Sequence, residues 1–159
     1  MLVFLASIPP GETSINAIAK NLGIDNKTVQ HYLHILDVSG LARIIPRYKG
    51  GSVQLRDIGK VFINNPTLFS CLSQWVGEAI QIGTQREFFF CQTMMDAGEQ
   101  LFCSDLGDFQ TKQAIFEIGG KNKSGSQIQT AKLPAYLIKD DILVRSANSL
   151  PLYLFGFLY

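Results

Sequence analysis

The sequence predicts an α+β protein of two modules, residues 1–63 and a small α/β domain over residues 64–159. The 159 residues are 47% hydrophobic and 17% charged, which favours a packed core over intrinsic disorder. Two short helical patterns and a basic hairpin come first, whereas strands interleave with helices later. Residues 26–60 carry six basic and two acidic side chains (net +4), whereas residues 87–118 carry one basic and six acidic side chains (net −5). This charge contrast indicates two modules with different roles.

The overall composition excludes several classes of protein. The net charge of +1 means that a nucleic-acid partner has to be recognised by local charge. Three cysteines without a CxxC pair favour neither a disulfide scaffold nor a zinc ribbon, and they indicate a reducing, cytoplasmic location. No segment approaches the roughly 18 apolar residues of a membrane span, so we expect no membrane partner. Residues 1–6 resemble the last turns of a helix without an N-cap, which predicts a natural protein that starts further upstream.

The first module begins with two predicted helices. Ser14 is a good N-cap for a segment with apolar residues at helical spacing, and Gly23 is expected to end that helix. Asp25 or Asn26 caps a second helix, which ends at Gly40. The apolar stripe of the second helix consists of Val29, Leu33 and Leu36.

A basic hairpin is predicted to follow the two helices. Residues 41–45 form its first strand, residues 47–51 its turn and residues 52–55 its returning strand, with residues 60–63 as a candidate for one more strand. Two helices joined by a tight turn and followed by a hairpin make a helix-turn-helix with a wing. In that fold the start of the second helix enters the major groove of DNA.

Side chains suited to nucleic-acid contacts gather at the start of the second helix and on the hairpin. Threonine and glutamine can contact base edges, lysine and arginine can pair with phosphate, and histidine can do either. The candidates on the helix are Lys27, Thr28, Gln30 and His31. Those on the hairpin are Arg43, Arg47 and Lys49. The alternative is that the basic hairpin is a solvated edge and that the module binds protein, since one fold serves several functions.

The second module is predicted to begin with helices and to continue with strands. Pro66 begins a helical stretch, and a longer helix covers about residues 78–97, with three consecutive phenylalanines largely buried. Strands are predicted at residues 100–104, 108–111, 113–118 and 135–139, with a short helix at 126–131. The apolar residues of segment 151–159 are expected to pack into this module.

Two carboxylates and a lysine form a second candidate site. Asp108 begins one predicted strand, Glu117 comes late in the next, and Lys121 follows two glycines later. Carboxylates on adjacent strands can hold Mg²⁺, and a nearby lysine can position water or phosphate, as metal-dependent phosphodiester cleavage requires. Four residues of strand span about 13 Å, so the chain has to bulge at the glycines to bring Lys121 back. In the alternative, these residues have structural roles and hold no metal. Asp108 caps a turn, and Glu117 forms a surface ion pair with Lys121 or Lys123.

The Gly-Gly-Lys-Asn segment does not form a phosphate-binding P-loop. The spacing GxxxxGK[ST] is absent, and Asn122 stands where serine or threonine would bind magnesium. We therefore expect no ATP hydrolysis by this chain and no cofactor, apart from Mg²⁺ if the carboxylate site is active.

Six segments of the sequence share a pattern with a known protein family. They are TVQHYLHIL (28–36), REFFF (86–90), DF (108–109), FEIGGKNK (116–123), QI (127–128) and PLYLFGFLY (151–159). They resemble the C-terminal region of prokaryotic AAA-type ATPases, in which an ATPase domain precedes a winged helix and a PD-(D/E)XK-nuclease-like domain of unknown function. The resemblance implies that Asp108, Glu117 and Lys121 fall on the nuclease-like acidic pair and lysine, with Glu87 as a helix-borne carboxylate. Two extra residues relative to the Glu-x-Lys pattern favour a degenerate site over an active one.

The predicted function is therefore that of a nucleic-acid-binding and regulatory C-terminal fragment of an AAA-type ATPase. Its expected partners are DNA and an upstream ATPase domain that this chain lacks. One alternative is a magnesium-dependent nuclease, with the metal on Asp108 and Glu117 and with Lys121 beside them. The other alternative is a protein-interaction module.

Overall fold

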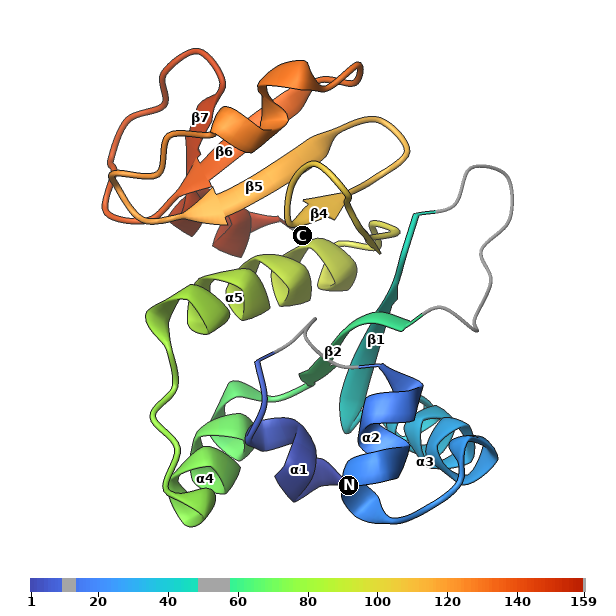
Figure 1. Cartoon of the computed structure of the whole chain (residues 1–159). Coiled ribbons are helices and arrows are strands. Elements are labelled where there is room, and N and C mark those ends of the chain that lie inside the picture. Colours follow the sequence, from blue (N-terminus) through green and yellow to red (C-terminus); the bar gives the residue numbers. More distant parts are fainter. Residues whose placement is uncertain (10–13, 49–57, 159) are drawn as a thin grey trace. The chain divides into compact units, whose positions relative to one another are not determined.

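The chain folds into two compact units (Figure 1). The computed structural model describes residues 1–9, 14–48 and 58–158. In the sequence, the boundary between the units falls between Ile80 and Gln81. The predicted mixture of helices and strands is confirmed: a two-stranded antiparallel sheet lies in the first unit and a five-stranded mixed sheet in the second.

The described residues of the first unit form four helices and two strands. In chain order they are α1 (Leu2–Ala6), α2 (Ile15–Leu22), α3 (Asn26–Val38), β1 (Ala42–Pro46), β2 (Ile58–Ile63) and α4 (Pro66–Val76). Ser14 caps α2 as predicted, because its side chain accepts a hydrogen bond from the Ala17 amide at 3.2 Å. Gly23 ends α2 with a φ of +66°, a left-handed conformation that glycine adopts without strain.

The strand β1 pairs with β2, and the register joins Ala42 to Ile63 and Ile45 to Lys60. The predicted strand at 41–45 is thus confirmed within one residue, and the candidate strand at 60–63 is its partner. The predicted returning strand at 52–55 lies outside the described residues.

The helix α4 belongs to the first unit, although the sequence analysis places it in the second module. Its Leu68, Phe69 and Leu72 pack against the core that buries Val29 and Leu33. Helical periodicity predicts that α4 has an apolar stripe, but it does not indicate which core receives that stripe.

The second unit is built around a five-stranded sheet, in which the strand order is β3-β4-β5-β6-β7. Its elements are α5 (Ile82–Asp96), β3 (Phe102–Cys103), β4 (Phe109–Gln110), β5 (Ile115–Gly119), the 3₁₀ helix η1 (Ser126–Thr130), β6 (Ala135–Lys139), β7 (Ser149–Pro151) and the 3₁₀ helix η2 (Leu152–Phe157). The strands β3, β4 and β5 are antiparallel neighbours, whereas β5, β6 and β7 run parallel. Because a parallel pair needs a crossover, η1 lies between β5 and β6 in the chain.

One face of the sheet packs against α5 through aromatic rings. The fully buried Phe90 of α5 lies with its ring centroid 5.8 Å from that of Phe109, 5.1 Å from that of Phe116 and 4.8 Å from that of Phe155. Phe89 is 37% exposed, so the predicted burial of all three phenylalanines holds for two of them. A helix turns about 100° per residue, so three consecutive side chains cannot all face the sheet.

The C-terminal segment packs only in part, which corrects the prediction that its apolar residues all pack into this module. Leu152 is buried and Phe155 is half-buried against Phe90, whereas Leu154 and Phe157 are exposed. The cause is the 3₁₀ geometry of η2, in which residues three apart share a face. Leu152 and Phe155 therefore face the core, and the residues between them do not.

Candidate functional site

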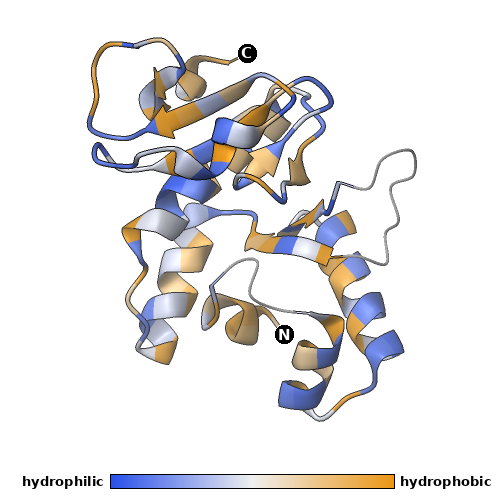
Figure 2. Cartoon of the chain, turned by 45° about the horizontal axis from the view of Figure 1, so that its top comes forward, coloured by the Kyte–Doolittle hydropathy of each residue, from blue (hydrophilic) through white to orange (hydrophobic). Residues whose placement is uncertain are grey.

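The helix α3 carries a polar face that is exposed to solvent. Its apolar face is buried through Val29 and Leu33, which fixes the orientation of the helix within the first unit. Figure 2 shows hydrophobic and hydrophilic residues alternating along α3, as in an amphipathic helix. Four exposed side chains at spacing i, i+3, i+4 and i+7 form what we call the α3 polar face: Lys27, Gln30, His31 and His34.

Thr28, which the sequence analysis assigns to base contacts, supports the start of α3 instead. Its hydroxyl donates a hydrogen bond to Asp25 Oδ2 at 2.6 Å, and its amide donates to Asp25 Oδ1 at 3.0 Å. These two hydrogen bonds, with a weaker contribution from the Lys27 amide, hold the pKa of Asp25 below its usual value of 3.8. Asp25, rather than Asn26, is therefore the N-cap of α3.

The basic residues after α3 have different roles. Arg43 of β1 donates a hydrogen bond from Nε to Asn64 Oδ1, and Asn64 Nδ2 donates to the Gly40 carbonyl at 2.9 Å. This chain of contacts joins the end of α3 to both strands. Arg47 is exposed just beyond β1, and Lys49 lies outside the described residues. The side chain of Arg47 is thus available for an external partner, whereas that of Arg43 has an internal role.

The helix α3 also exposes apolar side chains that sequence analysis did not identify. Tyr32 is 45% exposed, Ile35 46% and Val38 73%. Hydrophobic periodicity identifies a buried stripe, and these residues lie beside that stripe without any further signal in the sequence. An exposed apolar surface of this kind is the observation that favours a protein partner.

The carboxylate residues of the second candidate site come opposite each other, Glu117 within β5 and Asp108 directly before β4. The antiparallel register that pairs Phe109 with Phe116 places Asp108, one residue before β4, opposite Glu117 of β5. Asp108 Oδ2 accepts a hydrogen bond from the Ile118 amide at 2.8 Å. The structure thus brings the two predicted carboxylates to the same level of the sheet.

Glu117 is buried and paired with Lys123. Its side chain is 1% exposed, and Lys123 Nζ lies 3.2 Å from Glu117 Oε1. The second carboxylate oxygen, Oε2, is buried and has no hydrogen-bond partner within the described part of the chain. Since an unsatisfied buried oxygen costs about 1–3 kcal/mol, this atom is suited to a water or a cation.

The lysine that reaches Glu117 is Lys123, which the alternative of an ion pair names, and not the Lys121 of the predicted metal site. Lys121 is exposed, and its carbonyl accepts a hydrogen bond from Lys139 Nζ at 3.1 Å. Gly119 explains the difference. A Cβ at Gly119 would lie 2.6 Å from Cβ and Cγ of Lys123, so the missing side chain makes room for the Lys123 stem. The turn closed by the Lys123 amide on the Gly120 carbonyl at 3.0 Å then directs that stem back over β5.

Arg86 of α5 lies against the same glycine turn. Its Nε donates to Asp140 Oδ2 at 3.0 Å, and its guanidinium occupies the space above Gly120. The side chain of Arg86 is 16% exposed, so the contact fastens α5 to the ends of β5 and β6. Glu87, the predicted helix-borne carboxylate, is half-buried on α5.

Asp108 and Glu117 are the residues that would hold Mg²⁺ at this site. Magnesium is bound by one or two carboxylates together with water and substrate phosphate, and the unpartnered Oε2 of Glu117 fits that requirement. Across residues 1–9, 14–48 and 58–158, no group of three or more His, Cys, Asp or Glu side chains gathers as a metal site. Within the same residues, no helix has the length and apolar character to span a membrane.

The first unit matches a family model, and the match agrees with the boundary between the units. Residues 1–79 match the family described as Domain of unknown function (DUF8612). The match ends beside the unit boundary at Ile80, so it includes α4 together with α1–α3 and the small sheet. No curated protein and no solved structure matches the chain.

Proposed function

We propose that the first unit is a winged helix-turn-helix that binds nucleic acid through α3. The exposed α3 polar face carries this proposal. Its support is the order of the elements: α2, a turn at Gly23, α3, and then the antiparallel strands β1 and β2. In that arrangement Gln30 and His31 would contact base edges. Lys27 and Arg47 would pair with phosphate.

The proposal is tested by measuring how salt changes DNA binding by the full chain. Replacing both Lys27 and Arg47 with alanine removes two phosphate contacts, so affinity falls for every sequence and the salt slope decreases by about one unit per contact. The matched control is Lys112→Ala, which removes an exposed cation from the second unit. Equal salt slopes for the double variant and the wild type would favour the protein-interaction alternative through Tyr32, Ile35 and Val38.

The wider context that we propose is a cytoplasmic, prokaryotic AAA-type ATPase of which this chain is the C-terminal part. The support is the resemblance of segments 28–36 and 116–123 to that family. The chain itself would bind nucleic acid and regulate the ATPase domain without hydrolysing ATP. Saturable micromolar binding of ATP to this chain alone would contradict that division of roles.

A second candidate function is phosphodiester cleavage at β5, and the buried, unpartnered Oε2 of Glu117 supports it. The spacing of Lys121 favours a degenerate site, but the fold supplies another lysine at the carboxylate. Mg²⁺ on Asp108 and Glu117 would polarise a phosphodiester. Lys123 would then stabilise the charge that develops on the phosphate.

The two lysines allow a sharp test of this second function. Cleavage of single- and double-stranded DNA and RNA is measured with Mg²⁺ or Mn²⁺. If the site is active, Glu117→Gln and Lys123→Ala abolish cleavage, whereas Lys121→Ala retains it. Cleavage that survives Glu117→Gln, or no cleavage by the wild type, would exclude this function. Circular dichroism of each variant separates lost chemistry from lost folding.

A further inference from the structure

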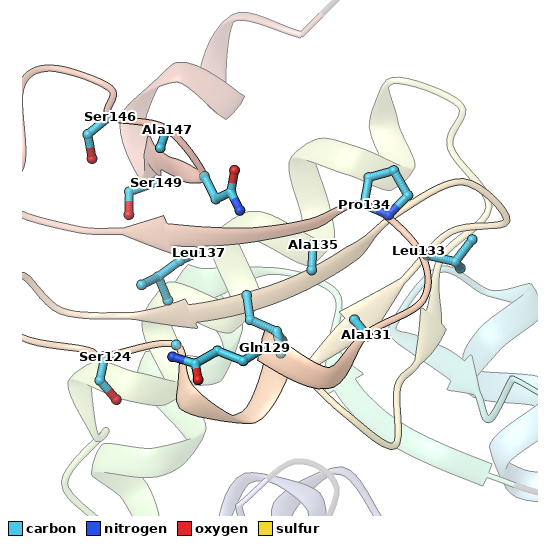
Figure 3. A pocket seen from close by; sticks show the side chains of 13 residues that line it. Ser124, Gln129, Ala131, Leu133, Pro134, Ala135, Leu137, Ser146, Ala147 and Ser149 are labelled. Carbon is cyan, nitrogen blue, oxygen red and sulfur yellow. The ribbon is translucent and has the colours of Figure 1, made fainter.

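A pocket of about 620 Å³ lies in the second unit, and two of its lining residues neighbour the Glu117–Lys123 pair in the sheet or in the sequence. Its lining comes from η1, β6 and the segment before β7, as Figure 3 shows. Leu137 lines the pocket and is the register partner of Glu117 on β6, and Ser124 of the lining follows Lys123 directly in the chain. The volume lies within the range of roughly 300–1000 Å³ that small-molecule sites occupy.

The described residues that line the pocket include polar side chains, but none of these side chains is ionisable. Gln129 of η1 and Asn148 before β7 contribute amides, and Ser146 and Ser149 contribute hydroxyls. The side-chain amides of Gln129 and Asn148 make no hydrogen bond to any residue that the structure describes. Each amide therefore offers both donors and an acceptor to a ligand.

Apolar side chains form the rest of the wall. Ile128 and Leu137 are buried beneath the pocket, and Ala131 and Ala135 leave space because their side chains are small. A largely apolar site with a few amides suits a flat, uncharged group that has hydrogen-bonding edges. The described lining offers a phosphate no cation, whereas Lys123 directly precedes the lining residue Ser124 in the chain.

We propose that this pocket binds the base of one nucleotide of a single-stranded nucleic acid and directs the adjoining phosphate toward Lys123. This inference rests on the second candidate function, because it names the substrate class of the β5 site. Bases in single strands are free to leave the stack, and amide side chains hydrogen-bond to their edges. Lys123 has a side chain that is 38% exposed, so its ammonium is accessible to such a phosphate.

The test uses nucleosides, which carry no phosphate and need no catalysis. Adenosine, guanosine, cytidine and uridine, with their 5′-monophosphates, are titrated into the full chain and followed by NMR. We expect saturable binding of at least one nucleoside. Gln129→Ala or Asn148→Ala weakens it by about two- to tenfold, the value of one hydrogen bond. The control is Gln127→Ala, an exposed residue of η1 that does not line the pocket.

Two further comparisons locate the ligand. Ala131→Leu fills the pocket and is expected to abolish nucleoside binding. The monophosphate binds more tightly than the nucleoside, and Lys123→Ala removes that advantage. Binding that is unchanged in Ala131→Leu, or equal in Gln129→Ala and Gln127→Ala, would overturn the proposal.

The two experiments test the proposed pocket ligand and the proposed cleavage reaction independently of each other. Nucleoside binding without cleavage of any substrate supports the pocket and excludes the second candidate function. Cleavage that depends on Glu117, without binding of any nucleoside, supports the reaction and overturns the pocket.

Discussion

The two candidate sites hold their polar side chains in opposite ways. On α3, Lys27 and His31 are exposed, and only the helix itself brings them together. On β5, Glu117 is 1% exposed and is paired with a lysine that a turn brings back. A helix places residues three and four apart on one face, so the site on α3 depends only on the local spacing of residues in the sequence. The site on β5 depends also on which residues of the neighbouring strand and of the following turn lie beside it.

The largest expected loss of stability comes from the aromatic core of the second unit, and it is compared with that of an exposed ring on the same helix. Phe90→Ala removes a fully buried ring that contacts three other aromatic rings, and we expect a loss of about 3–5 kcal/mol in the free energy of unfolding. Phe89→Ala, one residue earlier and 37% exposed, is the control and should cost much less. Urea denaturation measures both. Equal losses would show that α5 does not pack as described.

The next effect tests whether Gly119 makes room for Lys123. Gly119→Ala would place a Cβ within 2.6 Å of the Lys123 stem, and we expect a destabilisation of about 1–3 kcal/mol. Gly83→Ala is the matched control, because, apart from its chain neighbours and the nearby helix backbone, no atom of the described residues lies within 4 Å of its added Cβ. In α5 that change should stabilise the protein, by up to about 1 kcal/mol. If both variants have the same stability, the packing of Lys123 over Gly119 is refuted.

A somewhat smaller effect distinguishes the two lysines after β5. Lys123→Ala leaves the buried Glu117 without its ion pair. Because Lys123 is itself 38% exposed, we expect a cost of about 1–2 kcal/mol and not the larger value of a fully buried pair. Lys121→Ala should be close to neutral. Thermal denaturation measures both losses. A larger loss of stability in Lys121→Ala than in Lys123→Ala would refute the pairing of Glu117 with Lys123.

The smallest effect concerns the cap of α3. The pKa of Asp25 is lowered in the folded protein, so its contribution to stability is present above the usual value of 3.8 and is lost as the pH falls below it. Asp25→Ala should therefore lower the melting temperature slightly at about pH 6 and by less at about pH 3. A difference between wild type and variant that grows with acid would contradict this linkage.

The helical start of the protein is largely predictable from its sequence. Ser14 and Gly23 mark the two ends of α2, and Asp25 marks the start of α3. These positions are predictable because capping depends on residues within one turn. The spacing of Lys27 and Gln30 likewise predicts their common face. The internal role of Thr28 was not predicted, since threonine at that position can contact a base or the N-cap carboxylate equally well.

The carboxylate site was predictable in part. Alternation along β5 places Glu117 on the η1 face with Ile115, and the adjacent strand brings Asp108 opposite. The choice between Lys121 and Lys123 depends on how the chain turns after Gly119, which strand periodicity does not encode. The pocket beside η1 was not predicted at all, because Gln129 and Asn148 come together only through the order of β6 and β7.

NMR of the full chain with duplex DNA tests the claim that the first unit binds nucleic acid through α3. We expect the backbone amide signals of residues 27–34 to shift on addition of DNA, and we expect added salt to reverse the shifts. Signals of the buried core around Phe90 should stay in place. Shifts confined to the second unit, or no shifts at low salt, would contradict the claim.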